Sequence, residues 1–379
     1  MTTTPSPSEV NSSSQWLKGL GLVLLATLAL SLQNVIARIA TSTRPISILG
    51  GLFELGGYVA PNADKLQVSL LVLLLRVTFV VPMLWIMVSV LKPGAWAEVR
   101  HIVMGSDRTL KLKIVAAGLL LFLSQIGTYL AIKDVGPAIA VTVFFIYPTV
   151  TTLLAWKVFG DRPSWQQWMA IGLIYAGCTW LTFAPRPIQL PKAAIVSPAN
   201  SSITPTSKAT ASPSIATSPS PTPKSAAPSG SSFAIGVVEA MLAGIVFAME
   251  GILAQSCFRQ INPAIFTGMI FSVEWLALLA VTLPFNKLPL NQGLILMGGM
   301  LSLATLSGYL FNNFGIKLIG AASVAVIGSS GPAVTSILAL LILTEALTMQ
   351  NWLAILVVTL GVVLMNLAKA AKNRQEKST

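Results

Sequence analysis

Blocks of apolar residues of helical length alternate with short polar segments along most of the chain. Each block approaches the ~20 apolar residues that a helix needs to cross a bilayer. The blocks predict ten transmembrane helices, at residues 17–40, 67–91, 111–133, 136–158, 164–184, 233–257, 264–284, 290–316, 320–343 and 350–369. We therefore expect an all-α membrane protein.

The predicted helices fall into two groups of five, separated by a segment dominated by proline, serine, threonine and alanine. That segment has no apolar periodicity and cannot bury enough apolar surface to fold. The expected organisation is a disordered N-terminus (1–16), a first five-helix repeat (17–184), a disordered linker (185–232), a second five-helix repeat (233–369) and a basic C-terminal tail (370–379).

The two groups are related by an internal repeat, because residues 135–177 align with 319–361 without a gap. Five residue pairs in register are hard to attribute to chance: Gly136 with Gly320, Pro148 with Pro332, Gln166 with Gln350, Trp168 with Trp352, and Gly177 with Gly361. Five crossings reverse the direction of the chain, so the second repeat is predicted to be inverted. Inverted repeats are typical of secondary transporters, whose binding site lies near the midplane between them.

Composition and charge agree with a membrane protein. Only 9% of the residues are charged and the mean hydropathy is +0.77, whereas a soluble domain carries about 25% charged residues. The net charge of +12 does not predict a nucleic-acid partner, because the basic residues mostly flank apolar blocks, as on the cytoplasmic side of membrane proteins. Their distribution predicts that both termini are cytoplasmic and that the linker lies on the opposite side. We expect the membrane to be the plasma membrane.

Two segments carry a family resemblance: "GPAIAVTVFFIYPTVTTLLAWKVFGDRPSWQQWMAIGLIYAG" and "GAASVAVIGSSGPAVTSILALLILTEALTMQNWLAILVVTLG". Each has a helix of small residues with a proline (Pro148, Pro332) and a closing acidic residue (Asp161, Glu345). The chain resembles the EamA-type transporters of the drug/metabolite transporter superfamily. The resemblance implies ten transmembrane helices and alternating-access transport of small metabolites, often export. The linker and the long first loop depart from the compact form of that family.

Three charged residues lie well inside predicted helices: Arg76, Glu250 and Glu274. An ionisable side chain at the bilayer centre costs ~2.5–3.5 kcal/mol on insertion scales and tends to face a polar interior. Arg76 and Glu274 occupy equivalent helices of the two repeats. They are either a buried ion pair that neutralises itself or charges that face the substrate. Glu250 has no suitably placed basic residue in its own helix, so it is a candidate to carry a coupling proton or to bind a cationic group.

Pairs of polar residues that share a helix face complete the predicted substrate site: Asn34 with Arg38, Gln125 with Tyr129, and Tyr309 with Asn313. Such residues line a pathway about as often as they join helices to one another, and Arg38 could instead extend to the membrane surface. Pro148 and Pro332 are predicted to kink their helices, because proline removes a backbone hydrogen bond. Glu345 is expected to cap a helix or close a tight turn, or else to take part in gating.

The sequence has no phosphate-binding glycine loop, no Ser–His–Asp arrangement and no cluster of metal ligands, so we expect no enzymatic activity, cofactor or metal. The leading hypothesis is a secondary transporter that exports a small, amino-acid-like metabolite. A nucleotide-sugar or sugar-phosphate carrier, a cation or drug exporter and a non-transporting membrane scaffold are the alternatives. Proton coupling and a homodimer are left open.

Overall fold

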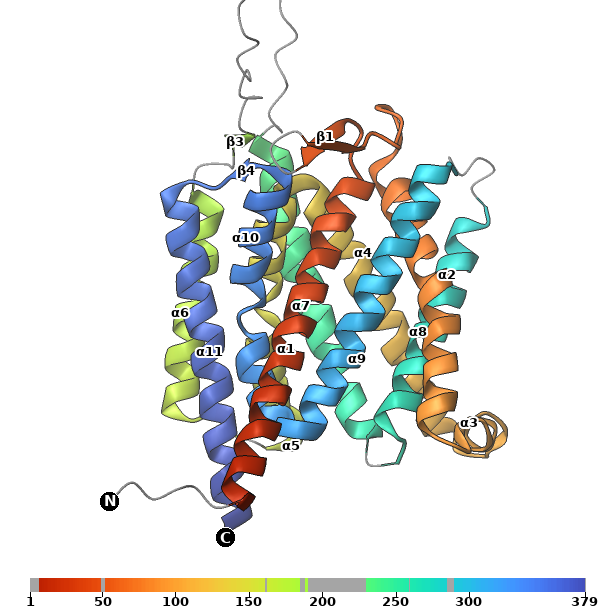
Figure 1. The fold of residues 1–379 in the computed structure, drawn as a ribbon, viewed down its shortest axis with the longest axis vertical. Helices are drawn as coiled ribbons and strands as arrows, with labels where there is room; N and C mark the ends of the chain where they lie inside the picture. The colour runs from red at the N-terminus through yellow and green to blue at the C-terminus, as the bar shows by residue number, and fades with distance from the viewer. Residues whose placement is uncertain are drawn as a thin grey trace, which may run out of the picture.

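The computed structural model describes residues 7–48, 52–160, 162–184, 188–189, 230–258, 260–284 and 290–378. Long helices form one bundle (Figure 1). The helices are α1 (Pro7–Ala40), α2 (Lys65–Leu91), α3 (Ala95–Met104), α4 (Arg108–Phe144), α5 (Tyr147–Phe159), α6 (Trp165–Phe183), α7 (Gly230–Cys257), α8 (Pro263–Thr282), α9 (Gln292–Gly328), α10 (Gly331–Leu343) and α11 (Met349–Ser378). Four short strands accompany them: β1 (Pro45–Ile48), β2 (Phe53–Gly56), β3 (Ile188–Gln189) and β4 (Glu345–Ala346).

Seven helical stretches of the described chain are long and apolar enough to cross a bilayer. They span residues Gln15–Ala40, Lys65–Val90, Arg108–Val158, Ser232–Cys257, Pro263–Thr282, Gln292–Asn312 and Met349–Ala368. The chain is therefore a multi-pass, predominantly α-helical membrane protein. Many large apolar side chains on the outer faces of these helices are exposed, such as Leu242 and Leu303, as expected where lipid replaces water.

The bundle has two distinct ends (Figure 1). At one end, which we call the linker end, β1 pairs with β2 and β3 pairs with β4, both antiparallel. At the other, the termini end, lie α3, the start of α1 and the end of α11. The segments on either side of residues 190–229 therefore meet the bundle at the end opposite the chain termini.

Local sequence signals explain where several helices begin. Asp64 and Asp107 each precede a helix, and their carboxylates accept hydrogen bonds from backbone N–H groups of the first turn. Ser164 and Gln167 form a reciprocal capping box at the start of α6, and Asn262 caps α8 just before a proline. Such side chains satisfy N–H groups that have no partner within the helix.

Two helices are interrupted at matching places. Residues 145–146 separate α4 from α5, and residues 329–330 separate α9 from α10. Pro148 and Pro332 lie in the first turns of α5 and α10, where a missing N–H costs nothing. The two prolines thus follow a break between helices instead of bending one continuous helix, which differs from the predicted kink.

The predicted boundaries need correction around these interruptions. The helices expected at 111–133 and 136–158 meet within α4 at Gly136, whose non-helical backbone (φ 82°) lies at the predicted break. The helices expected at 290–316 and 320–343 likewise meet within α9. The polar residues near Gly136 signal a reversal of the chain. The break at 145–146 lies within apolar sequence and leaves no polarity signal, whereas the break at 329–330 falls in the run "GSSGP" (328–332), whose glycines, serines and proline indicate an interruption.

Other expectations about irregular segments were also wrong in part. Helix α1 begins at Pro7, inside the N-terminus that was expected to be disordered (1–16). The long first loop contains the β1–β2 hairpin, and the loop after α2 contains α3. Within the predicted linker (185–232), residues 188–189 form β3 and residues 230–232 begin α7. The rest of the linker and Asp161 lie outside the described residues, and α11 continues through most of the basic tail.

Helices α6 and α11 cross at two equivalent contacts, in each of which a glycine of one helix packs against a branched side chain of the other. A Cβ atom on Gly177 would lie 2.5 Å from Val358 Cγ2, and one on Gly361 would lie 2.8 Å from Ile174 Cγ1. The sequence repeat aligns Gly177 with Gly361 and Ile174 with Val358. Each glycine therefore lets the other helix approach its backbone at equivalent points, as small residues do in membrane helix pairs.

Candidate functional site

Arg76 is the centre of a polar cluster inside the bundle. Its side chain lies on α2 and is 1% exposed. Nη1 donates hydrogen bonds to Gln125 Oε1 at 3.2 Å and to Tyr129 Oη at 3.3 Å, both on α4. The guanidinium carbon lies 5.8 Å from the centre of the Tyr129 ring, within the range of a cation–π contact. The Nε atom is buried and has no hydrogen-bond partner among the described residues.

Glu274 lies on α8, opposite in charge to Arg76. It is 0% exposed, and neither carboxylate oxygen has a hydrogen-bond partner among the described residues. The two side chains interact electrostatically, but the guanidinium does not hydrogen-bond to the carboxylate. A buried carboxylate without a hydrogen bond is costly. Both oxygens of Glu274 are therefore available to accept hydrogen bonds from a ligand.

Tyr309 of α9 connects this pair to Glu250. Its side chain is close enough to interact electrostatically with Arg76, Glu250 and Glu274, and its ring packs edge-on against Phe271, with the centroids 5.6 Å apart. Glu250 lies on α7 and is buried. The structure thus gathers charged and aromatic side chains from α2, α4, α7, α8 and α9 into one region, which we call the central cluster: Arg76, Gln125, Tyr129, Glu250, Glu274 and Tyr309.

Arg38 does not join the central cluster. Its Nε donates to Glu345 Oε1 at 3.3 Å, and its Nη1 donates to the backbone carbonyls of Ile132 and Lys133. Arg38 is therefore held by Glu345 and by two backbone carbonyls and does not hydrogen-bond to the residues that bind Arg76. Glu345 does not cap α11, because Thr348 Oγ1 accepts the N–H of the first turn there; burial raises the pKa of the Glu345 carboxyl and the Arg38 charge opposes that shift.

The remaining predicted residues are spread along the bundle. Asn34 is half-buried on α1, one turn before Arg38. The side chain of Asn313, on α9, lies outside the described residues. Sequence reasoning missed the aromatic side chains beside the first helix interruption, where Tyr147 packs against Phe144 and Phe247 with ring centroids 5.5 Å and 5.1 Å apart. The run "VFFIYP" (143–148), which contains the break, was the signal that could have indicated them.

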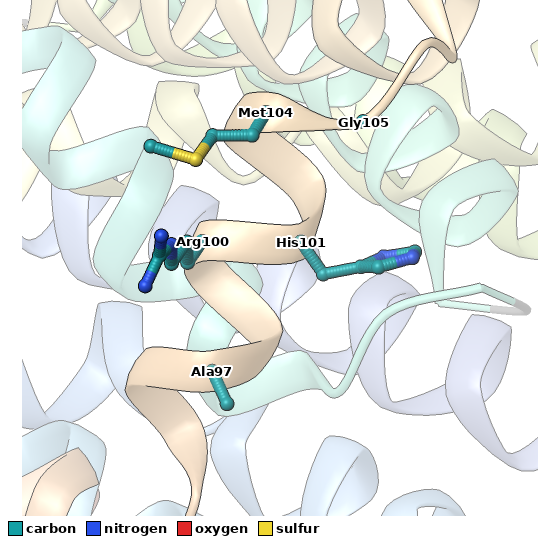
Figure 2. A pocket seen from close by; sticks show the side chains of 5 residues that line it. All are labelled: Ala97, Arg100, His101, Met104 and Gly105. Carbon is teal, nitrogen blue, oxygen red and sulfur yellow. The ribbon is translucent and has the colours of Figure 1, made fainter.

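A surface hollow of about 400 Å³ lies on α3, away from the central cluster (Figure 2). Its lining residues all belong to α3 or follow it directly, and the side chains of Arg100 and His101 point away from each other. One face of one helix offers no converging groups, so we assign no site there. Among the described residues, no group of three or more His, Cys, Asp or Glu side chains could hold a metal ion.

The fold and the central cluster define a multi-pass α-helical membrane protein with charged groups buried among its helices. The sequence profile of the EamA-like transporter family matches residues 234–367. The "Uncharacterized transporter sll1319" of Synechocystis sp. (strain ATCC 27184 / PCC 6803 / Kazusa) is 31% identical over 367 residues, covering 96% of this chain and 97% of that protein. The chain belongs to the EamA-like transporter family and is a membrane transporter.

A solved crystal structure overlaps with 93% of this chain and 98% of its own, with a TM-score of 0.47 and 12% identity. A likeness this low adds nothing to the assignment.

Proposed function

We propose that this protein is a secondary transporter that exports a small polar metabolite of amino-acid type by alternating access, with the central cluster as its substrate site. The observation that carries the proposal is the pair of opposite charges at Arg76 and Glu274. Both are fully buried, both retain unused hydrogen-bonding atoms, and they do not bond to each other. A ligand with one acidic and one basic group would satisfy both.

The charges of the central cluster also allow the alternative substrate classes to be ranked. A nucleotide-sugar or sugar-phosphate carrier needs several basic side chains to bind phosphate, and Arg76 is the one basic residue that we place in the central cluster. Two carboxylates, Glu250 and Glu274, lie near it. Export of an organic cation is therefore the second candidate, because these carboxylates and the rings of Tyr309 and Tyr147 suit a positively charged ligand. Glu250 is the residue that we assign to a coupling proton.

The proposal is tested by a transport screen in a strain from which the gene is deleted. We expect the strain to accumulate one or a few amino-acid-like compounds, and the purified protein in proteoliposomes to transport them. Panels of phosphorylated sugars and of organic cations serve as comparisons. Transport restricted to either of those panels would reject the amino-acid-type substrate, and transport of none would reject the site.

We further propose ten membrane crossings in two inverted repeats, 17–184 and 233–369, with both termini in the cytoplasm of a plasma-membrane protein. The paired helix interruptions at 145–146 and 329–330 and the repeated glycine contact between α6 and α11 support this arrangement. Helices α5 and α10 would each complete a crossing that begins in the preceding helix. Five crossings before the linker then put it on the far side of the membrane.

This topology predicts that a cysteine introduced into the linker, such as Ser212→Cys, reacts with a membrane-impermeant thiol reagent in intact cells. A cysteine placed near the C-terminus, such as Ser378→Cys, should react only after permeabilisation. Cys178 and Cys257 are buried and are replaced by Ser to give a silent background. Labelling of both positions from the same side would contradict an odd number of crossings between linker and terminus.

A further inference from the structure

Five charged side chains meet at the linker end of the bundle. Lys65 Nζ at the start of α2 binds Asp134 Oδ2 of α4 at 2.7 Å and Glu239 Oε1 of α7 at 2.7 Å. Arg38 of α1 binds Glu345 of β4 at 3.3 Å. We call Arg38, Lys65, Asp134, Glu239 and Glu345 the linker-end ion cluster.

Two of these three ion pairs, Lys65–Glu239 and Arg38–Glu345, join the part of the chain before the linker to the part after it. Arg38, Lys65 and Asp134 precede residues 190–229, whereas Glu239 and Glu345 follow them. Side-chain exposures between 8% and 28% make the pairs partly buried. They are therefore screened less by salt than pairs on an open surface. The two 2.7 Å contacts of Lys65 have the length of strong charge-assisted hydrogen bonds.

The ion cluster surrounds the point where the chain reverses within α4. Arg38 binds the carbonyls of Ile132 and Lys133, and a Cβ atom on Gly136 would lie 2.8 Å from Glu345 Oε2. A Cβ atom on Gly236 of α7 would lie 2.7 Å from Asp134 Cβ. Backbone and charged side chains from α1, α2, α4, α7 and β4 are thus packed together at this end of the bundle.

We propose that the linker-end ion cluster is a gate: its ion pairs hold the linker end closed in this structure, and they must separate before the central cluster can open to that side. The inference rests on the alternating-access mechanism proposed above, which requires access from each end in turn. Ion pairs that join two moving parts at one end stabilise only the state in which that end is closed. Removing them therefore shifts the equilibrium towards the open state.

The test measures how fast a reporter cysteine in the central cluster reacts, and it needs no substrate. The reporter is Gln125→Cys in the Cys178→Ser, Cys257→Ser background. An impermeant thiol reagent is added from the side on which a linker cysteine reacts. Glu239→Gln keeps the size of the side chain and removes one ion pair between the two parts of the chain. A glutamine at position 239 could still accept a hydrogen bond from Lys65. The second variant is therefore Lys65→Met, which has no donor and removes both pairs that Lys65 makes.

We expect each variant to raise the labelling rate about fivefold or more, the lower end of typical coupling between two states of a protein. The matched control is Glu98→Gln, which removes the ion pair with Lys92 at the termini end and should not raise labelling from the linker side. Unchanged labelling in both gate variants, with the protein monodisperse, would overturn the proposal. An equal rise in the control would overturn it too, because the effect would then be general loosening. The assay is independent of the transport screen, so a failed gate and a failed substrate assignment can be told apart.

Discussion

Replacing Glu274 with glutamine is expected to leave the protein folded and inserted but to lower its transport rate on the order of 100-fold, because the basic group of the substrate loses its partner in a buried charge pair, which costs about 2–5 kcal/mol. Glutamine keeps the size of the side chain and removes its charge. The carboxylate is 0% exposed and has no hydrogen-bond partner among the described residues. The substitution therefore breaks no hydrogen bond among the described residues and removes the ionic interaction with the substrate.

The measurement is uptake of the compound identified in the screen into proteoliposomes, at equal amounts of Glu274→Gln and unchanged protein. Glu54→Gln is the matched control, because Glu54 is an exposed carboxylate on β2 at the linker end. We expect the control to transport at the unchanged rate. Full transport by Glu274→Gln would exclude the central cluster as the substrate site.

Exchanging the two charges, by Arg76→Glu together with Glu274→Arg, separates a structural ion pair from a substrate site. Either single change places two like charges near each other in the bundle, and an unbalanced buried charge destabilises a protein by about 3–5 kcal/mol. The exchange restores neutrality, so the abundance of folded protein should recover. We expect transport to stay as low as in Glu274→Gln, because each end of the substrate now meets a like charge.

Abundance is measured by fluorescence-detected size exclusion, and transport by the same uptake assay. Gln125→Ala is a useful companion, because it removes one acceptor of Arg76 and keeps both charges. Recovery of most transport in the exchanged protein would mean that Arg76 and Glu274 only neutralise each other. The substrate would then bind elsewhere among the described helices.

The outline of the fold could be predicted because each helix that crosses a bilayer needs ~20 predominantly apolar residues. Apolar blocks of membrane length gave both ends of α2, α6, α7 and α8 within a few residues, and one end of the other long helices. The break at 145–146 could not be placed in this way, since the residues around it are apolar and only Pro148 marks it. The break at 329–330 lies in the run "GSSGP", a signal that the prediction of one helix over 320–343 passed over. The hairpin β1–β2 was missed because two four-residue strands in a loop carry little periodic signal.

The sequence indicated individual candidate residues of the site, but it did not indicate which of their side chains are neighbours in the folded protein. Helix order alone associated Arg76 with Glu274, and burial cost made both conspicuous. Arg38 carried the same signal as Arg76, yet its partner Glu345 is 307 residues away in sequence. Local spacing can say that a charge needs a partner. It cannot say which of several distant carboxylates will be the neighbour once the helices have packed.

Helix α10 has a consequence for how the protein is made. It contains 13 residues, which extend about 20 Å at the rise of an α-helix, less than the ~30 Å hydrocarbon core of a bilayer. Alone it could not span the membrane during synthesis. It needs protein neighbours, and the Ser31 hydroxyl of α1 already donates a hydrogen bond to the Gly331 carbonyl at its start, at 3.4 Å. We therefore expect α10 to take its place in the membrane together with α9 and only once α1 is present to pack against it.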